Sequence, residues 1–175
     1  MKQHIGFAIL SSLALTLGCT QPTAPGGFEG EVGLQMYSFR EDFKKDVPGT
    51  IQKIKELGFK EVELAGTYGM APDAFKKMLA EAGLIPIAAH FPYNKLRDDI
   101  ESVAQEAKAL GLKYVGCAWA GHKPPLDEKQ TLEIAGVFNR AGEALAKHGM
   151  KFFYHNHGFE FQPHGDGTLF DLLMK

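Results

Sequence analysis

Ala109-Leu110-Gly111-Leu112 is one of four copies of a local pattern that decides the fold. Each copy runs from the end of a predicted helix through a glycine to an apolar residue, and a strand-like run follows it. Glycine just past a helix takes the left-handed conformation that closes the helix, and the next apolar residue packs back on the last turn. The other copies are Glu56-Leu57-Gly58-Phe59, Glu81-Ala82-Gly83-Leu84 and Lys147-His148-Gly149-Met150.

Strand-like and helix-like segments alternate around these copies. The predicted strands are residues 32–39, 60–65, 85–91, 114–118 and 151–155. Between them, apolar residues recur at helical spacing: Ile51, Ile54 and Leu57; Phe75, Met78, Leu79 and Ala82; and Ile100, Val103, Ala104, Ala107 and Leu110. Asp46 and Asp127 are predicted N-caps, and Pro48 and Pro72 are predicted to lie in first helical turns.

Alternating strands and helices predict a parallel sheet with right-handed crossovers. The fold class is therefore α/β, either a (β/α)8 TIM-type barrel or a doubly wound open sheet. No G-x-G-x-x-G motif follows the first strand, which disfavours a dinucleotide-binding sheet. A barrel needs about eight βα units and about 250 residues, whereas this chain has 175. We expect an incomplete barrel of about five units that ends at residues 167–175, with a complete five-stranded open sheet as the alternative.

Residues 1–19 have the pattern of a signal peptide. Lys2 precedes an uncharged run, residues 5–17, which is shorter than the about 20 residues of a membrane-spanning helix. Leu17-Gly18-Cys19 resembles the lipobox of bacterial lipoproteins, with Cys19 as the lipidated residue, although Thr16 stands where such boxes usually have Leu. An ordinary secretory signal is the alternative. Thr20, rather than Asp, after the cysteine favours the outer membrane.

The predicted organisation is a signal peptide at 1–19, a flexible tether at 20–30 and a folded part at 31–175. We expect an exported bacterial protein, periplasmic or anchored to the outer membrane, that meets the membrane only through a lipid. The composition, 45% hydrophobic with a net charge of −2, excludes a disordered chain and disfavours nucleic-acid binding. Two cysteines form no disulfide framework, and Cys117 is predicted to be a small buried strand residue.

Ligands of parallel α/β folds bind beyond the carboxyl ends of the strands. The fifth predicted strand ends in His155-Asn156-His157, and Glu160 follows. Side chains alternate along a strand, so His155 and His157 are predicted to point to the same side. Two imidazoles with a carboxylate nearby suit a divalent metal such as Zn or Mn. The alternative is a pair of polar side chains satisfied by hydrogen bonds.

Four further residues at predicted strand ends are candidates for substrate contact. His90 follows an apolar run, where a buried structural histidine is the alternative. Glu63 shares one side of its strand with Glu61 and needs a partner or ligand there. Trp119, the single tryptophan, is predicted either to stack on a sugar ring or to pack in the core, and Tyr37 is similarly ambiguous. The remaining loop histidines, His122 and His164, are predicted to be exposed.

Together these motifs resemble the sugar phosphate isomerase/epimerase family with the xylose isomerase-like TIM barrel. The resemblance rests on Gly33-Leu34-Gln35-Met36-Tyr37-Ser38, Val62-Glu63-Leu64, His90-Phe91-Pro92-Tyr93 and Tyr154-His155-Asn156-His157-Gly158-Phe159-Glu160-Phe161. It implies a divalent metal (Mn, Zn, Mg or Co) bound partly by His155, His157 or Glu160, with further ligands beyond Lys175. Many members have Glu where this chain has His155, so the first ligand stays open. His90 matches a histidine that binds metal or lies near substrate.

The resemblance further implies a small carbohydrate substrate. The expected reaction is isomerisation or epimerisation of a keto or aldo sugar, or a sugar phosphate, through an enediolate, with His155, His157 and Glu160 as catalytic candidates. The first alternative is a lyase or hydratase that acts on 3-keto-glycosides, as an inosose dehydratase-like enzyme would. The second is a lipid-anchored sugar-binding module without turnover. Abasic-site cleavage, the activity of apurinic endonucleases related to this family, conflicts with export and with the net charge of −2.

Overall fold

The computed structural model describes residues 30–175. The predicted signal peptide and lipidation site, and all but the last residue of the predicted tether, lie outside the described residues. The elements are β1 (Leu34–Gln35), η1 (Met36–Phe39), α1 (Arg40–Phe43), α2 (Val47–Glu56), β2 (Glu61–Leu64), α3 (Pro72–Glu81), β3 (Ile85–His90), α4 (Tyr93–Asp98), α5 (Ile100–Leu110), β4 (Tyr114–Cys117), α6 (Glu128–Lys147), β5 (Lys151–Tyr154), η2 (Phe159–Phe161), β6 (Pro163–His164), β7 (Gly167–Thr168) and α7 (Leu169–Leu173). None of these helices is both long enough and apolar enough to cross a bilayer.

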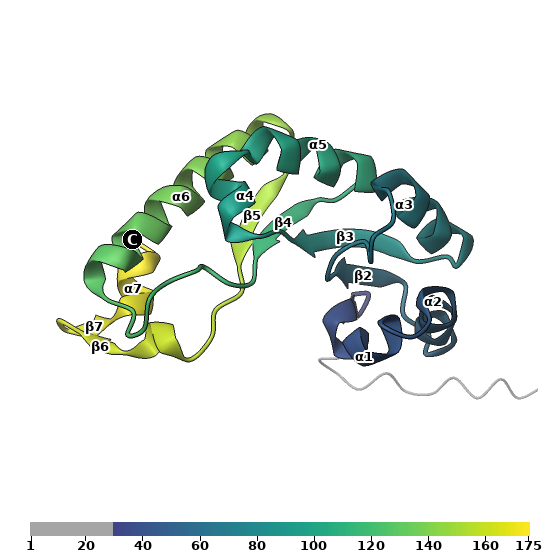
Figure 1. The fold of residues 1–175 in the computed structure, drawn as a ribbon, viewed down its shortest axis with the longest axis horizontal. Helices are drawn as coiled ribbons and strands as arrows, with labels where there is room; N and C mark the ends of the chain where they lie inside the picture. Colours follow the sequence, from purple (N-terminus) through teal and green to yellow (C-terminus); the bar gives the residue numbers. More distant parts are fainter. Residues whose placement is uncertain (1–29) are drawn as a thin grey trace, which may run out of the picture. The chain divides into compact units, whose positions relative to one another are not determined.

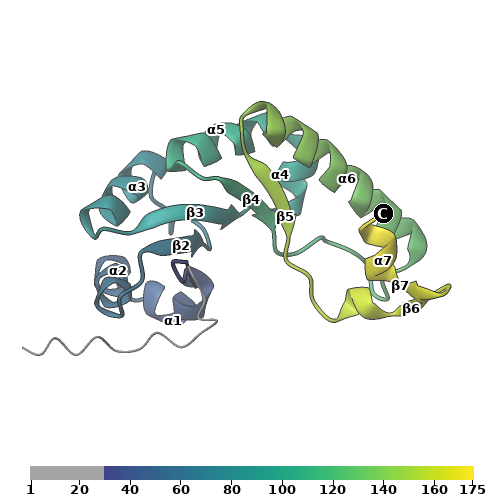
Figure 2. The same ribbon diagram turned by 180° about the vertical axis from the view of Figure 1, so that it is seen from behind.

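Strands β1 to β5 form one sheet in which every neighbouring pair is parallel. The strands lie in the same order as in the sequence, without the reversal that defines a doubly wound sheet. Right-handed crossovers in such an order place successive helices on the same face, and α3, α5 and α6 do follow one face of the sheet (Figures 1 and 2). This confirms the barrel-type arrangement over the open-sheet alternative.

The core lies between this helical face and the sheet. Val62 and Leu64 of β2 and Val115 and Cys117 of β4 are all buried at 1% exposure or less. They pack with the apolar stripes of the helices, among them Ile54, Leu79, Val103, Ala107 and Leu145. Burying a Val, Leu or Ile side chain contributes about 1.5–3 kcal/mol. Because side chains alternate along a strand, Glu61 and Glu63 are left on the opposite face of β2.

The predicted helix ends are confirmed. All four pattern glycines have left-handed backbones, with φ between 75° and 88°. In three copies the next residue donates its N–H back into the last helical turn, as Leu112 does to the carbonyl of Ala107. Asp46 and Asp127 cap α2 and α6 by accepting the N–H groups of Gly49 and Gln130. Leu57, predicted to face the core, is 58% exposed instead, because it caps α2 at the point where the chain turns away.

The first strand is shorter than predicted. It ends at Gln35, where pairing with Glu63 stops, and Met36–Phe39 form a 3-10 turn. This turn buries Met36 completely and leaves Tyr37 56% exposed, with the guanidinium of Arg40 4.8 Å from its ring centre. Tyr37 therefore lies two residues beyond the end of β1, in the turn rather than on the predicted strand.

Gly83→Ala tests the contribution of the left-handed helix end. A methyl group at Gly83 meets no atom within 4 Å, so the change acts through the backbone angle alone. We expect the free energy of unfolding to fall by roughly 1–2 kcal/mol, the cost of the left-handed conformation for an L-residue. Chemical denaturation measures it. Gly121→Ala is the matched control, because that position is equally open and has no positive φ. An equal loss in both variants would contradict the explanation.

Candidate functional site

A polar group lies on the sheet face away from the helices, across β1, β2 and β3. Gln35 donates its side-chain N–H to Oε1 of Glu63 over 2.8 Å. The same carboxylate oxygen lies 3.1 Å from Nε2 of His90. The register explains this proximity, since Gln35 pairs with Glu63, and His90 lies two residues beyond Ala88, the partner of Glu63 on β3. The structure therefore gives Glu63 the polar partners that the sequence analysis required.

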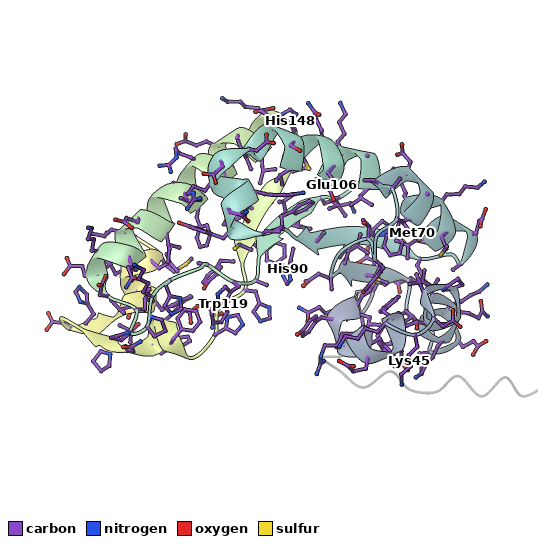
Figure 3. The ribbon with its side chains drawn as sticks, viewed as in Figure 1. Lys45, Met70, His90, Glu106, Trp119 and His148 are labelled. Carbon is purple, nitrogen blue, oxygen red and sulfur yellow. The ribbon has the colours of Figure 1, made fainter. Side chains whose placement is uncertain are left out.

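His90 lies inside this group, on the opposite side of the sheet from Glu106 and His148 (Figure 3). Its Nε2 is buried and, despite the 3.1 Å approach, makes no hydrogen bond of acceptable geometry. Burial lowers the pKa of His90 below the usual 6.5. The charge of Glu63 acts in the opposite direction, and His155 lowers the pKa further. His90 is thus held in its neutral form, which can accept a proton.

Gly116 of β4 makes room for the apolar lining of His90. A side chain at this buried position would overlap the ring of Phe153, which lies across the glycine from neighbouring β5. The Phe153 ring centre is 5.3 Å from that of His90. An aromatic ring therefore covers one side of the imidazole and contributes to its desolvation.

The two predicted metal-binding histidines follow β5 and lie close together, as expected. The ring centres of His155 and His157 are 5.1 Å apart, and that of His155 is 5.5 Å from His90. His155 is exposed, whereas Nδ1 of His157 is buried without a hydrogen-bond partner. The strand ends at Tyr154, so both imidazoles lie on the segment beyond it. The same end of the sheet thus holds the imidazoles of His90, His155 and His157 and the carboxylate of Glu63.

Glu160, the third predicted ligand, is turned into the protein. It is 1% exposed, and its two carboxylate oxygens accept the Tyr154 hydroxyl at 2.5 Å and the His157 backbone N–H at 2.9 Å. Burial and then the hydrogen bond to Glu160 raise the pKa of Tyr154, so the phenol keeps the proton that it donates. In this arrangement Glu160 fixes the segment that carries the histidines.

Imidazole and carboxylate donors suit a divalent metal. Among residues 30–175, however, no three such side chains come together in a way that could hold a metal ion. Both oxygens of Glu160 are already used in hydrogen bonds. The described residues therefore do not fit a metal by themselves, and we derive no catalytic step through one.

An aromatic group lies next to the histidines, at the carboxyl ends of β4 and β5. The ring of Phe159 contacts those of Trp119, His122 and His157 at centre distances of 5.2, 4.3 and 5.6 Å. Trp119 also meets His157 edge to face at 5.3 Å. Trp119 is 53% exposed, which rules out the core position that was its alternative. We call Trp119, His122, His157 and Phe159 the aromatic platform.

Sequence reasoning missed His122 and Phe159. Gly121 and two prolines around His122 indicated an exposed loop, but the ring is half-buried against Phe159 and Nδ1 lies 3.1 Å from the carbonyl oxygen of Ala120. The only available signal was the common position of both residues after strand ends.

Other predicted residues lie outside this group. His164 is half-buried, 3.9 Å from Glu128. Cys117 is fully buried, as predicted, and burial raises its pKa to about 11. Its thiol is therefore no nucleophile at neutral pH.

The titration of His90 tests the local electrostatics. We expect a pKa below 6.5. Glu63→Gln removes a charge that favours the imidazolium, so it lowers that pKa further, and His155→Asn raises it because a repulsive neighbour is lost. NMR of the imidazole Cε1–H group measures both shifts. His148, on the opposite side of the sheet, serves as the control whose signals stay unchanged. A rise in the Glu63→Gln variant would refute the assignment.

Glu160→Gln tests the role of the buried carboxylate. In this variant an amide NH2 group replaces one of the two carboxylate oxygens, both of which accept hydrogen bonds. The NH2 group then faces either the Tyr154 hydroxyl or the His157 N–H, which is itself a donor. We expect a loss of about 1–3 kcal/mol in the free energy of unfolding. Glu81→Gln, in an exposed pair with Lys77, should cost less than about 0.5 kcal/mol. Equal costs in the two variants, measured by urea denaturation, would show that Glu160 is not a buried anchor.

Three solved structures are similar to the described fold. A sugar phosphate isomerase/epimerase from Parabacteroides distasonis ATCC 8503 is 23% identical, with a TM-score of 0.69 over 88% of this chain and 63% of that protein. A family 2 AP endonuclease from Brucella melitensis is 19% identical, with a TM-score of 0.59 over 71% and 54%. The IolI protein, crystallised with a zinc atom, is 11% identical, with a TM-score of 0.56 over 71% and 51%.

At these identities the three likenesses show the fold alone, and the chain spans less than two-thirds of each of the three proteins. No curated protein sequence matches the chain. The sequence model described as the xylose isomerase-like TIM barrel matches residues 51–173, which include β2 to β5 and the histidines at their ends. The chain therefore belongs to the family of xylose isomerase-like TIM barrels.

Proposed function

We propose that this protein is an isomerase or epimerase of a keto or aldo sugar, or of a sugar phosphate, that works through an enediolate. The observation that carries the proposal is the placement of the His90 imidazole between the Glu63 carboxylate and the His155 imidazole, at the strand ends of a xylose isomerase-like barrel. The similarity of the fold to the solved structure of a sugar phosphate isomerase/epimerase supports the same substrate class.

In this proposal His90 removes the weakly acidic proton from the carbon next to the sugar carbonyl. Glu63, 3.1 Å away, stabilises the imidazolium that forms, and Gln35 holds Glu63 in place. His155, whose ring centre lies 5.5 Å from that of His90, would return a proton from its imidazolium form at the neighbouring carbon or the opposite face. General acid and base groups placed this way typically contribute about 10²–10⁴-fold each.

A divalent cation, Mn, Zn, Mg or Co, is part of the proposal. Support comes from the zinc atom in the IolI structure, whereas residues 30–175 alone would not hold such an ion. Export and a lipid anchor at Cys19 are likewise proposed, on the motif Leu17-Gly18-Cys19 alone. An exported enzyme would meet sugars and glycosides from outside the cell, which keeps the 3-keto-glycoside lyase as the second candidate.

Exchange of a sugar C–H with solvent deuterium tests the carbanion chemistry. With Mn²⁺ present, we expect the proton NMR signal of the carbon next to the carbonyl to disappear for at least one ketose, aldose or 3-keto-glycoside. His90→Asn should slow the exchange by about 10²–10⁴-fold. His148→Asn, which loses only a contact with Glu101 on the other side of the sheet, should leave it unchanged.

The outcomes separate the candidates. Exchange with return of the proton supports the isomerase or epimerase, and release of the aglycone from a 3-keto-glycoside supports the lyase. If no sugar exchanges, with or without metal, the enediolate mechanism is wrong, and a binding module without turnover becomes the better description.

A further inference from the structure

We propose that Gln130, in the first turn of α6, is a positioning residue. Its side chain fixes the loop between β4 and α6, residues 118–127, and so keeps the His122 ring against the rings that surround His157. Gln130 acts through this loop rather than by touching a substrate. The placement of His122 does not depend on any reaction, whereas the effect on the reaction rate rests on the proposed function, and the two are measured separately.

The amide of Gln130 is bonded to the backbone of the loop at three points. Its Oε1 accepts the N–H of Lys123 over 2.7 Å, and its Nε2 donates to the carbonyl oxygens of Lys123 and Pro125 at 3.1 and 3.2 Å. A glutamine amide has one oxygen acceptor and two N–H donors, so every kind of group that it offers is used. The reversed amide would turn its NH2 group toward the Lys123 N–H, and only one orientation therefore satisfies the loop.

The start of α6 leaves the Gln130 side chain available for this role. Asp127 is the N-cap, and its carboxylate accepts the backbone N–H of Gln130 over 2.8 Å. In a capping box, a glutamine at this third helical position returns its side chain to the backbone of the N-cap. Here the side chain extends instead to residues five and seven positions earlier in the chain. Asp127 thus holds the helix start, and Gln130 holds the loop.

Few other interactions hold the middle of the loop. The side chains of Ala120 and Leu126 are 1% and 5% exposed and anchor it at two points. Between these anchors, within the described part of the chain, residues 121–125 make no backbone–backbone hydrogen bond. The three bonds of Gln130 are therefore the backbone contacts that set the path of this segment, which includes His122.

His122 connects the loop to the imidazoles that follow β5. Its ring centre lies 4.3 Å from that of Phe159 and 5.6 Å from that of Trp119. Both of these rings contact His157, at 5.6 and 5.3 Å. His157 in turn lies 5.1 Å from His155, the proposed proton donor. A displaced loop therefore changes the packing around His157, and a misplacement of about 1 Å is enough to slow a catalysed step.

Two substitutions separate a role in the loop from a role in the helix. Gln130→Ala removes all three bonds. Gln130→Glu keeps an acceptor for Lys123 N–H but turns a carboxylate oxygen toward two carbonyl oxygens. Glutamate near a helix start is favourable for the helix, so a purely helical role predicts that Gln130→Glu is harmless. The matched control is Gln52→Ala, because the Gln52 side chain donates to Glu56 within its own helix, α2.

Proton NMR of the His122 Cε1–H group measures the placement of the ring, because the neighbouring Phe159 ring shifts this signal. The signal is assigned by its loss in His122→Asn. We expect it to move toward the value of an exposed histidine in both Gln130 variants and to stay in place in Gln52→Ala. Time-resolved anisotropy of Trp119, the single tryptophan, should gain a fast nanosecond component in the Gln130 variants.

Urea denaturation of the same proteins excludes a general loss of structure. We expect the urea midpoints of both Gln130 variants to stay close to that of Gln52→Ala. An unmoved His122 signal in Gln130→Ala, or a native signal in Gln130→Glu, overturns the proposal. A fall in the urea midpoint that accompanies the His122 shift would also overturn it, because Gln130 would then support the fold as a whole.

The effect on the reaction is measured with the sugar that exchanges its C–H in the unmodified protein. At saturating sugar, Gln130→Ala should slow the exchange by about 10–10²-fold, and Gln52→Ala should leave it unchanged. Unchanged exchange despite a displaced His122 rejects the positioning role in the reaction. If no sugar exchanges in the unmodified protein, the proposed function fails, while the His122 signal still decides whether Gln130 fixes the loop.

Discussion

The alternation of side chains along β2 is the constraint on which both the core and the candidate site depend. Val62 and Leu64 face the helices, because the burial of these apolar side chains stabilises the sheet against them. Glu63 is then forced to the other face. A partly buried carboxylate needs partners there, and the parallel register supplies Gln35 from β1 and His90 from β3. The packing that builds the core therefore also assembles the polar group.

The position of the second pair of imidazoles depends on a different interaction, the buried carboxylate of Glu160. It accepts hydrogen bonds from Tyr154, the last residue of β5, and from the backbone of His157. The raised pKa of Tyr154 keeps the phenol protonated across the physiological range, so this donor persists. The hydrogen bond between Glu160 and the backbone of His157 therefore fixes the segment after β5, which also carries His155 beside His90.

Local signals in the sequence predicted the parts of the fold that local physics decides. A glycine in the left-handed region and an aspartate at a helix start each act within about one turn, so the helix ends were predictable. The end of β1 and the exposure of Leu57 depend on what packs against them, and local patterns misplaced both. Glu160 has the spacing of a metal ligand, but its partner Tyr154 turns it inward. His122 was misjudged because its contact, Phe159, lies far along the chain.

Packing rather than charge sets the character of His90. Glu63 is its nearest charged neighbour and favours the imidazolium, yet the pKa falls because desolvation outweighs that attraction. Part of the desolvation comes from Phe153, and Phe153 can lie there only because Gly116 has no side chain. Glycine normally weakens a strand interior, but here it allows an aromatic ring to cover the imidazole. Gly116 thus helps to keep the imidazole of His90, the proposed base, neutral. Glu63 is close enough to stabilise the positive charge when His90 takes up a proton.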